Sequence, residues 1–146
     1  MPSRLSYQKH PAALRPLQDL DRYVRGCGLE PDLIELLLMR ISQLNGCAFC
    51  LDMHGRDARA GGETEQRLYV LPAWRETDLF SAREKAALAW VESVTRLDHG
   101  GITDDVYETA RAEFGERGLL DLNMVAILMN AWNRIAIPFR YSPAAA

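Results

Sequence analysis

The chain has 146 residues, a formal net charge of −3 and a pI near 5.6. This length indicates a single domain, residues 1–146, large enough to bury roughly 68–70% of the surface that its unfolded form exposes. The acidic balance and the scattered basic residues argue against a nucleic-acid partner, and no stretch approaches the roughly 18–20 apolar residues of a membrane span. Residues 1–14 lack the apolar core of a signal peptide, so we expect a cytoplasmic protein.

Apolar residues recur at helical spacing along most of the chain, and no segment shows strict apolar alternation or a hairpin signal. This pattern predicts an all-α, single-domain helical bundle with about six to seven helices. Residues 1–10 show no clear period and are expected to form an N-terminal extension. The predicted helices cover residues 14–24, 32–44, 47–60, 64–71, 81–97, 104–114 and 121–137.

Several helix boundaries are marked by residues suited to helix ends. Ser81 and Glu84 have the spacing of a capping box, and Thr103 is suited to be the N-cap of the helix that follows it. Gly115 and Gly118 predict a turn between the last two helices.

The segments 32–44 and 121–137 carry apolar side chains around most of their circumference, so each must be enclosed in the core or between subunits. A chain of this length encloses two such helices with difficulty, and soluble monomers seldom expose large apolar patches. We therefore expect a homo-oligomer. Three amides on one side of the last helix are expected to bind packed backbone or a symmetric contact rather than a ligand: Asn123, Asn130 and Asn133.

Glu35 stands within the apolar segment 32–44, where its charge is costly to bury without a partner. One interpretation is a carboxylate that faces solvent or pairs with Arg40, and the composition of the segment alone favours it. The other is a proton-handling carboxylate, whose pKa burial raises toward neutrality unless a cation or several donors hold it ionised. The turn at Asn45-Gly46 allows the second interpretation, because it can fold the next helix back so that His54 faces Glu35.

Two of the three cysteines and one histidine come together in the stretch 45–57. In a helix from about Cys47, the side chains of Cys47, Cys50 and His54 share one face at i, i+3 and i+7. Gly46 places the pair at the helix N-terminus, where the first turn can distort to allow a disulfide and free N–H groups favour thiolates. In a reducing compartment, such a pair is more often catalytic, redox-active or metal-binding than a static crosslink.

The same spacing offers two candidates for the nucleophile. His54 lies four positions after Cys50, on the adjacent turn, and a base that activates a thiol must be near that thiol. Cys47 lies nearer the helix N-terminus, where the helix dipole lowers the pKa of a thiol most strongly. We favour Cys50 because of the histidine. Cys27, which is separate from the pair, is expected to be a buried, small apolar residue.

Three classes of function fit these residues. A thiol peroxidase or disulfide reductase uses Cys50 to attack a peroxide and Cys47 to form a disulfide. A metal-binding module would use both cysteines and His54, but a closed zinc site usually needs a fourth ligand and none stands at a standard spacing, so no metal is expected. A structural or redox-sensing homo-oligomer needs no turnover. Decarboxylation is disfavoured, because that chemistry has no evident use for a cysteine pair.

Glu35, Cys47, Cys50 and His54 stand in a local context that resembles the signature of the alkylhydroperoxidase D-like branch of the carboxymuconolactone decarboxylase superfamily. That context reads Arg-Ile-Ser-Gln-Leu-Asn-Gly-Cys-Ala-Phe-Cys-Leu-Asp-Met-His. The resemblance covers roughly residues 12–97, and the later run Asn-Ala-Trp-Asn-Arg is also similar to such chains.

The resemblance implies an all-helical homo-oligomer, with a trimer or hexamer favoured, in which the cysteine pair cycles between dithiol and disulfide while reducing hydroperoxides. Carried over by position, Cys50 is the peroxidatic thiol, Cys47 the resolving thiol, and Glu35 and His54 the proton relay. The resemblance also implies a dithiol reductant, of the dihydrolipoamide or a related type, and no bound cofactor. Peroxidase members often have a histidine immediately before the second cysteine, whereas this chain has Phe49, which shortens the expected relay.

Overall fold

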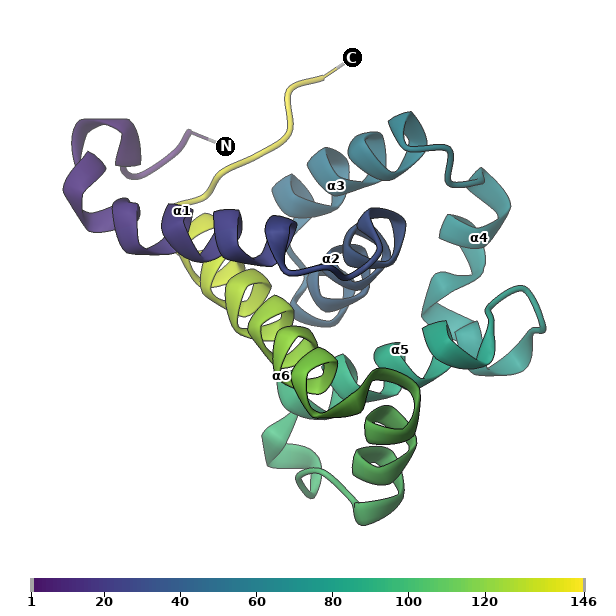
Figure 1. Ribbon diagram of the computed structural model, residues 1–146. Helices are drawn as coiled ribbons and strands as arrows, with labels where there is room; N and C mark the ends of the chain where they lie inside the picture. The colour runs from purple at the N-terminus through teal and green to yellow at the C-terminus, as the bar shows by residue number, and fades with distance from the viewer. Residues whose placement is uncertain (1, 146) are drawn as a thin grey trace.

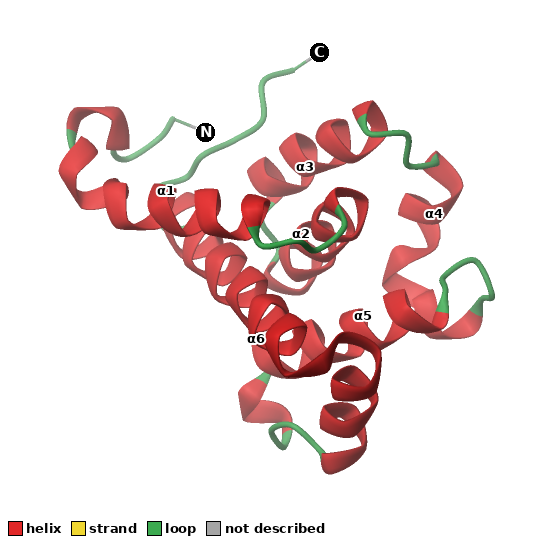
Figure 2. Cartoon of the chain, in the orientation of Figure 1, coloured by secondary structure: helices red, strands yellow, loops and turns green. Residues whose placement is uncertain are grey.

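The structure, a computed structural model, describes residues 2–145 as an assembly of helices (Figures 1 and 2). Within that range there are six α-helices and three short 3-10 helices, and no strand is found. None of the helices in that range is both long and apolar enough to cross a bilayer. The elements are η1 Tyr7–Lys9, α1 Pro11–Gly26, α2 Pro31–Asn45, α3 Ala48–Ala60, α4 Glu65–Val70, η2 Leu71–Glu76, α5 Ala82–Thr95, η3 Leu97–His99 and α6 Asp104–Ala136.

The expected all-α bundle is confirmed, and α2 lies at its centre (Figure 1). It packs against α3, α5 and α6. From Leu33 to Ser42 every side chain except that of Arg40 is buried, so this apolar helix is enclosed within one chain rather than between subunits. Burial of this many leucine and isoleucine side chains is the main source of stability for the fold.

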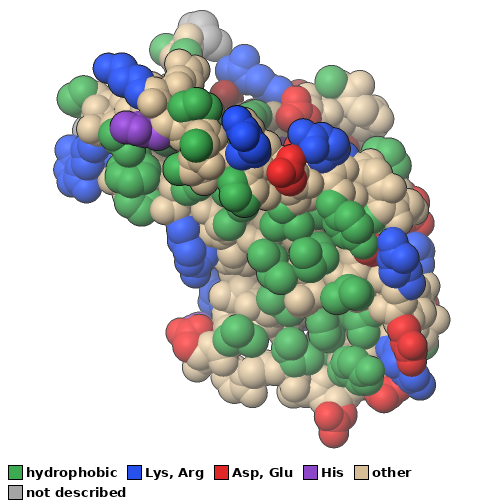
Figure 3. All heavy atoms as spheres, turned by 60° about the vertical axis from the view of Figure 1, so that its left-hand side comes forward, with side chains coloured by type: hydrophobic (Ala, Val, Ile, Leu, Met, Phe, Trp, Pro, Cys, Tyr) green, Lys and Arg blue, Asp and Glu red, His purple; other side chains and the backbone are tan. Residues whose placement is uncertain are grey.

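The part of α6 after Gly115 runs diagonally across the molecule, α1 crosses its C-terminal part, and α5 packs against α6 (Figure 1). The chain leaves one face of α6 uncovered, because Leu120 and Ile127, seven residues apart, are each about half exposed. Figure 3 shows a face of the molecule on which hydrophobic side chains gather with few charged groups among them. One chain therefore encloses most of the last helix but leaves part of its apolar surface exposed, as expected.

The predicted break between the last two helices is found at Gly115, but it is shorter than the expected turn between residues 114 and 121. α6 is interrupted only at Gly115, whose φ of 69° and ψ of 178° break the helix, and helical structure resumes directly after it. Only glycine adopts this backbone conformation at low cost. Gly118 lies inside the resumed helix, where an added Cβ would come within 3.0 Å of the Phe114 Cβ. The absence of a side chain at Gly118 therefore reflects close packing rather than a turn.

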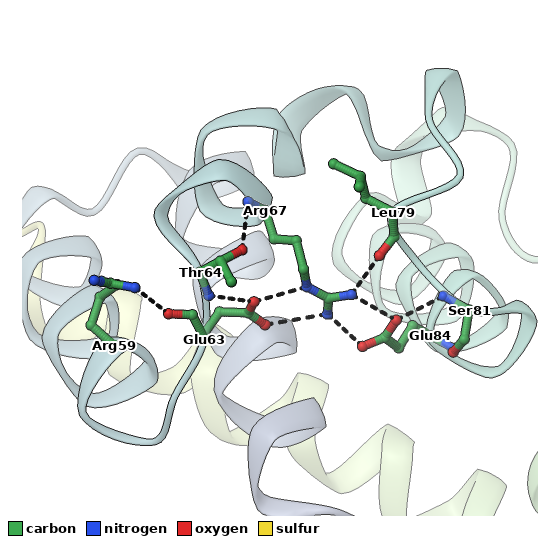
Figure 4. A network of polar contacts seen from close by, with 7 residues as sticks. All are labelled: Arg59, Glu63, Thr64, Arg67, Leu79, Ser81 and Glu84. Atoms are coloured by element: carbon green, nitrogen blue, oxygen red, sulfur yellow. Dashed lines mark hydrogen bonds and ion pairs between the residues drawn. The ribbon is translucent and has the colours of Figure 1, made fainter.

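The connection between α3 and α5 is held by one arginine. Figure 4 shows the Arg67 guanidinium between the carboxylates of Glu63 and Glu84, with a further hydrogen bond donated to the Leu79 carbonyl. These carboxylates, Glu84 first, raise the pKa of Arg67. The predicted capping box of α5 is confirmed, because Ser81 and Glu84 each accept the backbone N–H of the other. Thr103 likewise caps α6 by accepting the Val106 N–H, as predicted.

Candidate active site

The turn between α2 and α3 sets the position of the cysteine pair. Gly46 ends α2 in the left-handed region, at φ 72° and ψ 38°, and donates its N–H to the Ser42 carbonyl. Cys47 then adopts an extended conformation, at φ −91° and ψ 95°, and is the N-cap of α3. The expectation that Cys47 lies within the helix is therefore wrong by one residue, because the chain leaves the left-handed turn extended before the helix begins.

This extended conformation brings the two sulfur atoms together. Cys47 and Cys50 form a disulfide, with their Cα atoms 5.4 Å apart. The Cys47 Sγ also accepts the Cys50 N–H at 3.3 Å, so the cysteine caps the helix as a serine or threonine would. Cys27 is free and half-buried rather than fully buried.

Amide side chains anchor this turn to α6. Asn45, directly before Gly46, donates to both the Asn130 and the Asn133 side-chain carbonyls at 2.9 Å. Asn133 is fully buried and donates to the Ser42 hydroxyl at 3.2 Å. Two of the amides singled out in the last helix thus position the cysteine turn within one chain. The expected backbone partner is found for Asn130, which donates to the Ala126 carbonyl at 2.9 Å, and the other bonds join side chains. These bonds are a reason for Cys47 to keep a defined conformation.

A cavity of about 320 Å³ opens beside the pair. Cys50 and His54 are among its lining residues, whereas Cys47 is not, although both cysteines are almost completely buried. The wall is mostly apolar and aromatic and comes from α1, α2, α3, α6 and both ends of the chain. Its members include Leu38, Phe49, Met53, Met129, Trp132 and Tyr141. Of the two cysteines, Cys50 is therefore the one that the cavity reaches.

Glu35 meets His54 behind the cavity wall, because His54 lines the cavity and Glu35 does not. The His54 Nδ1 lies 2.9 Å from one carboxylate oxygen of Glu35, and the Arg25 guanidinium donates to the other at 2.6 Å. Glu35 and His54 are both buried, as the second interpretation of Glu35 requires. The alternative pairing of Glu35 with Arg40 is wrong, because Arg40 reaches Glu92 instead, at 2.6 Å.

The charge state of Glu35 differs from the one that burial alone would give it. Burial raises the pKa of this carboxyl group, but hydrogen bonds from His54 and Arg25 outweigh that effect, and the net result is a lowered pKa. The expected rise of this pKa toward neutrality is therefore wrong in direction. The expectation exempted a carboxylate held ionised by a cation or several donors, and Arg25 and His54 hold Glu35 in this way. A fixed carboxylate beside a histidine ring orients the ring and selects its tautomer.

Potential metal ligands do converge here, but they differ from the set that was weighed as an alternative from the sequence. Among the described residues, ligand atoms of Glu35, His54 and Asp57 lie within 4.8 Å of one another. Arg25 places a positive charge 2.6 Å from Glu35, which opposes a cation at this position. In the alternative set of Cys47, Cys50 and His54, neither sulfur is a thiolate while the disulfide is formed.

Sequence reasoning missed two classes of residue in the site. Arg25 comes from the last turn of α1, and Asp57 lies one turn beyond His54, with its carboxylate 4.0 Å from the His54 ring nitrogen. Tyr7 and Tyr141, near opposite ends of the chain, both line the cavity. The sequence carries no signal for Arg25, Tyr7 or Tyr141, because each depends on contacts between separate segments. Asp57 lies three residues after His54 on the same helix, and that spacing could have identified it.

The chain is similar to proteins of one family. Residues 11–93 match the carboxymuconolactone decarboxylase family model. The chain is 41% identical to YdfG of Bacillus subtilis (strain 168), an uncharacterized protein, over 138 residues that cover 94% of each chain. It is 26% identical to YnjA of Escherichia coli (strain K12), also uncharacterized, over 102 residues that cover 70% of this chain and 56% of YnjA.

Two solved structures resemble the fold. ATU0492 of Agrobacterium tumefaciens, a protein of unknown function suggested to be the antioxidant defence protein AhpD, superposes with a TM-score of 0.94 at 38% identity, covering 99% of this chain and 100% of that one. A peroxidase-related protein from Silicibacter sp. TM1040 superposes with a TM-score of 0.78 at 23% identity, covering 90% of this chain and 70% of that one. The second likeness concerns the fold alone.

Proposed function

The chain belongs to the carboxymuconolactone decarboxylase family, in its alkylhydroperoxidase D-like branch, and from this premise we propose that it is a thiol-dependent hydroperoxidase. The observation that carries the proposal is the position of Cys50, which is paired with Cys47, lines the cavity and shares that wall with His54. The suggested antioxidant role of ATU0492 is consistent with this activity.

The first step consumes the peroxide. The Cys50 thiolate attacks one oxygen of the O–O bond, which breaks, so that Cys50 becomes a sulfenic acid and the other oxygen leaves as an alkoxide. The alkoxide takes up a proton and departs as the alcohol. His54 is the group on the cavity wall suited to deliver that proton, after it has taken one from the Cys50 thiol.

The second and third steps restore the enzyme. The Cys47 thiolate attacks the Cys50 sulfur, the hydroxide of the sulfenic acid leaves with a proton as water, and the disulfide forms. An external dithiol then exchanges with this disulfide through Cys50 and is itself oxidised to a disulfide. In total, one hydroperoxide and one dithiol yield one alcohol, one water and one disulfide.

Glu35 acts through His54 in this scheme. Because Arg25 and His54 hold Glu35 ionised, its carboxylate accepts the His54 Nδ1–H and leaves the Nε2 atom for proton exchange in the cavity. Its negative charge also stabilises His54 while the ring carries an additional proton. Glu35 is thus a fixed orienting carboxylate of the relay.

We expect peroxide consumption by the purified protein when it is supplied with a suitable dithiol. Cumene hydroperoxide and H₂O₂ are assayed separately with dihydrolipoamide, dithiothreitol and a monothiol as reductants. Turnover that needs a dithiol supports the proposal. A monothiol reduces an intramolecular disulfide less efficiently, because the neighbouring protein thiol can displace it from the mixed disulfide. Reversible oxidation of the pair with no turnover under any of these combinations would contradict it and favour a redox-sensing role.

We expect the protein to be a homo-oligomer, with a trimer or hexamer favoured by the family. Several exposed hydrophobic side chains come from α6 and the segment just before it, and a patch of such residues is unusual on a soluble monomer. They include Leu97, Ile102, Tyr107, Leu120 and Ile127. Light scattering measures the mass in solution, and a value near the chain mass of 16.5 kDa at micromolar concentration would rule out the assembly. Ile127→Glu is expected to shift the mass downward.

A further inference from the structure

Two tyrosines from opposite ends of the chain close one side of the Cys50 cavity. Tyr7 belongs to η1, and Tyr141 follows the end of α6, yet both line the same cavity as Cys50 and His54. Neither tyrosine has a part in the proton transfers or sulfur chemistry proposed above. Their position on the wall calls for a different role.

The backbone before Tyr141 turns its ring back toward the cavity. Arg140 has a φ of 59°, in the left-handed region of the backbone that residues other than glycine rarely adopt. The Tyr141 N–H binds the Ala136 carbonyl at 3.0 Å and the Arg140 N–H binds the Ile137 carbonyl at 3.1 Å, which is the Schellman pattern of a helix end. A non-glycine residue persists in this conformation only where surrounding contacts require it.

Those contacts are made by the Tyr141 side chain. Its hydroxyl donates to the Leu5 carbonyl at 2.6 Å and accepts the Tyr7 N–H at 3.0 Å. Its ring meets the Tyr7 ring edge-on, with centroids 4.9 Å apart, and lies against the Phe49 ring at 5.8 Å. Tyr141 therefore joins the N-terminal segment to the residue that directly precedes Cys50.

We propose that Tyr141 is a specificity-determining residue that limits the size of molecules reaching Cys50. Its ring is held between Tyr7 and Phe49, so it forms a fixed wall of the cavity rather than a mobile surface side chain. Removing the ring widens the approach, whereas removing only the hydroxyl frees the N-terminal segment and keeps most of the wall. The proposal rests on the proposed function for its biological meaning, but the size limit applies to any reagent that attacks Cys50.

The test compares two maleimides that share a reactive group and differ in bulk, N-ethylmaleimide and pyrene maleimide. Each reacts with the reduced Cys47→Ser protein, and mass spectrometry follows the labelling of Cys50. Tyr141→Ala is expected to raise the labelling rate of the bulky reagent by about tenfold while changing that of the small one less than about twofold. Tyr141→Phe is expected to give a smaller increase in the same direction.

The control is Tyr69→Ala, which removes a tyrosine that is 73% exposed and does not line this cavity. Its rates with both reagents should match those of the parent protein. Equal changes with both reagents in Tyr141→Ala, or no change with either, would overturn the proposal. If that variant does not fold by circular dichroism, Tyr141→Leu keeps an apolar side chain at the helix end and decides the same question.

Labelling requires neither peroxide nor reductant, so its result is separate from the test of peroxidase activity. Size-selective labelling without peroxide turnover would leave the role of Tyr141 standing and overturn the proposed function. Peroxide turnover with labelling rates that do not depend on Tyr141 would support the proposed function and overturn the role of Tyr141.

Discussion

Cys50→Ser is expected to abolish peroxide-dependent turnover, whereas Cys47→Ser is expected to stop the cycle one step later. Without the Cys50 thiolate, no nucleophile faces the cavity, since Cys47 does not line it. Loss of a catalytic nucleophile should reduce turnover by roughly 10³-fold or more. Without Cys47, peroxide still oxidises Cys50, but no neighbouring thiol resolves the product, so a sulfenic acid accumulates on Cys50.

Two measurements check this assignment. Peroxide consumption is followed with a dithiol reductant, and the sulfenic acid is trapped with dimedone and located by mass spectrometry. Cys27→Ser serves as the control, because Cys27 is separate from the pair, and it should keep the parent activity. Trapping of the sulfenic acid on Cys47 in the Cys50→Ser protein, in place of Cys50 in the Cys47→Ser protein, would reverse the two roles.

Glu35→Gln is expected to lower the reactivity of Cys50 while leaving the fold intact. Glutamine has nearly the same shape, but it lacks the charge that orients His54 and stabilises a proton on it. Loss of general acid–base assistance typically costs about 10²–10⁴-fold in rate. The alkylation rate of Cys50 from pH 5 to pH 9 measures the effect without any peroxide. A pH–rate profile identical to that of the parent protein would contradict a role for Glu35 in the proton relay.

The same substitution should change the pH dependence of stability. Because the pKa of Glu35 is lowered in the folded protein from its usual 4.5, its carboxylate stabilises the fold above that value, and this contribution is lost as pH falls through the lower, folded pKa. Glu35→Gln should lower the free energy of unfolding at pH 7 by about 1–3 kcal/mol. In the Glu35→Gln protein, the free energy of unfolding should also fall less between pH 4.5 and lower pH than it does in the parent protein. Urea unfolding at pH 7 and pH 3.5 compares the two proteins.

Glu92 supplies a matched control for this experiment. Its side chain is 12% exposed against 11% for Glu35, and it is held by Arg40, Arg75 and the Trp74 indole. Burial raises its pKa, but bonds from these groups outweigh that effect and lower it, as for Glu35. Glu92→Gln should therefore destabilise the protein similarly and leave Cys50 alkylation unchanged, because the partners of Glu92 do not include His54. An equal loss of alkylation in both variants would show that the Glu35 effect is only structural.

Local features of the chain were sufficient to predict most helices and their ends. Hydrogen bonds at a helix start join residues three apart, so Ser81 with Glu84 and Thr103 with Val106 follow from short-range spacing. The apolar pattern of residues 32–44 likewise predicts a helix that must be enclosed. The cysteine pair, His54 and Glu35 were also identifiable from spacing and from the family resemblance.

Contacts between separate segments decided the rest. Gly115 predicts that a helix is interrupted, but how soon the next helix begins depends on how α5 and α6 pack. The sequence alone predicted a raised pKa for Glu35 unless it had a partner, and the tertiary structure supplied Arg25 from α1 and His54 from α3. Tyr141 reaches the cavity only because the two ends of the chain meet beside Phe49. Periodicity and capping act over a few residues, whereas the charge state of Glu35 and the shape of the cavity depend on distances set by the whole fold.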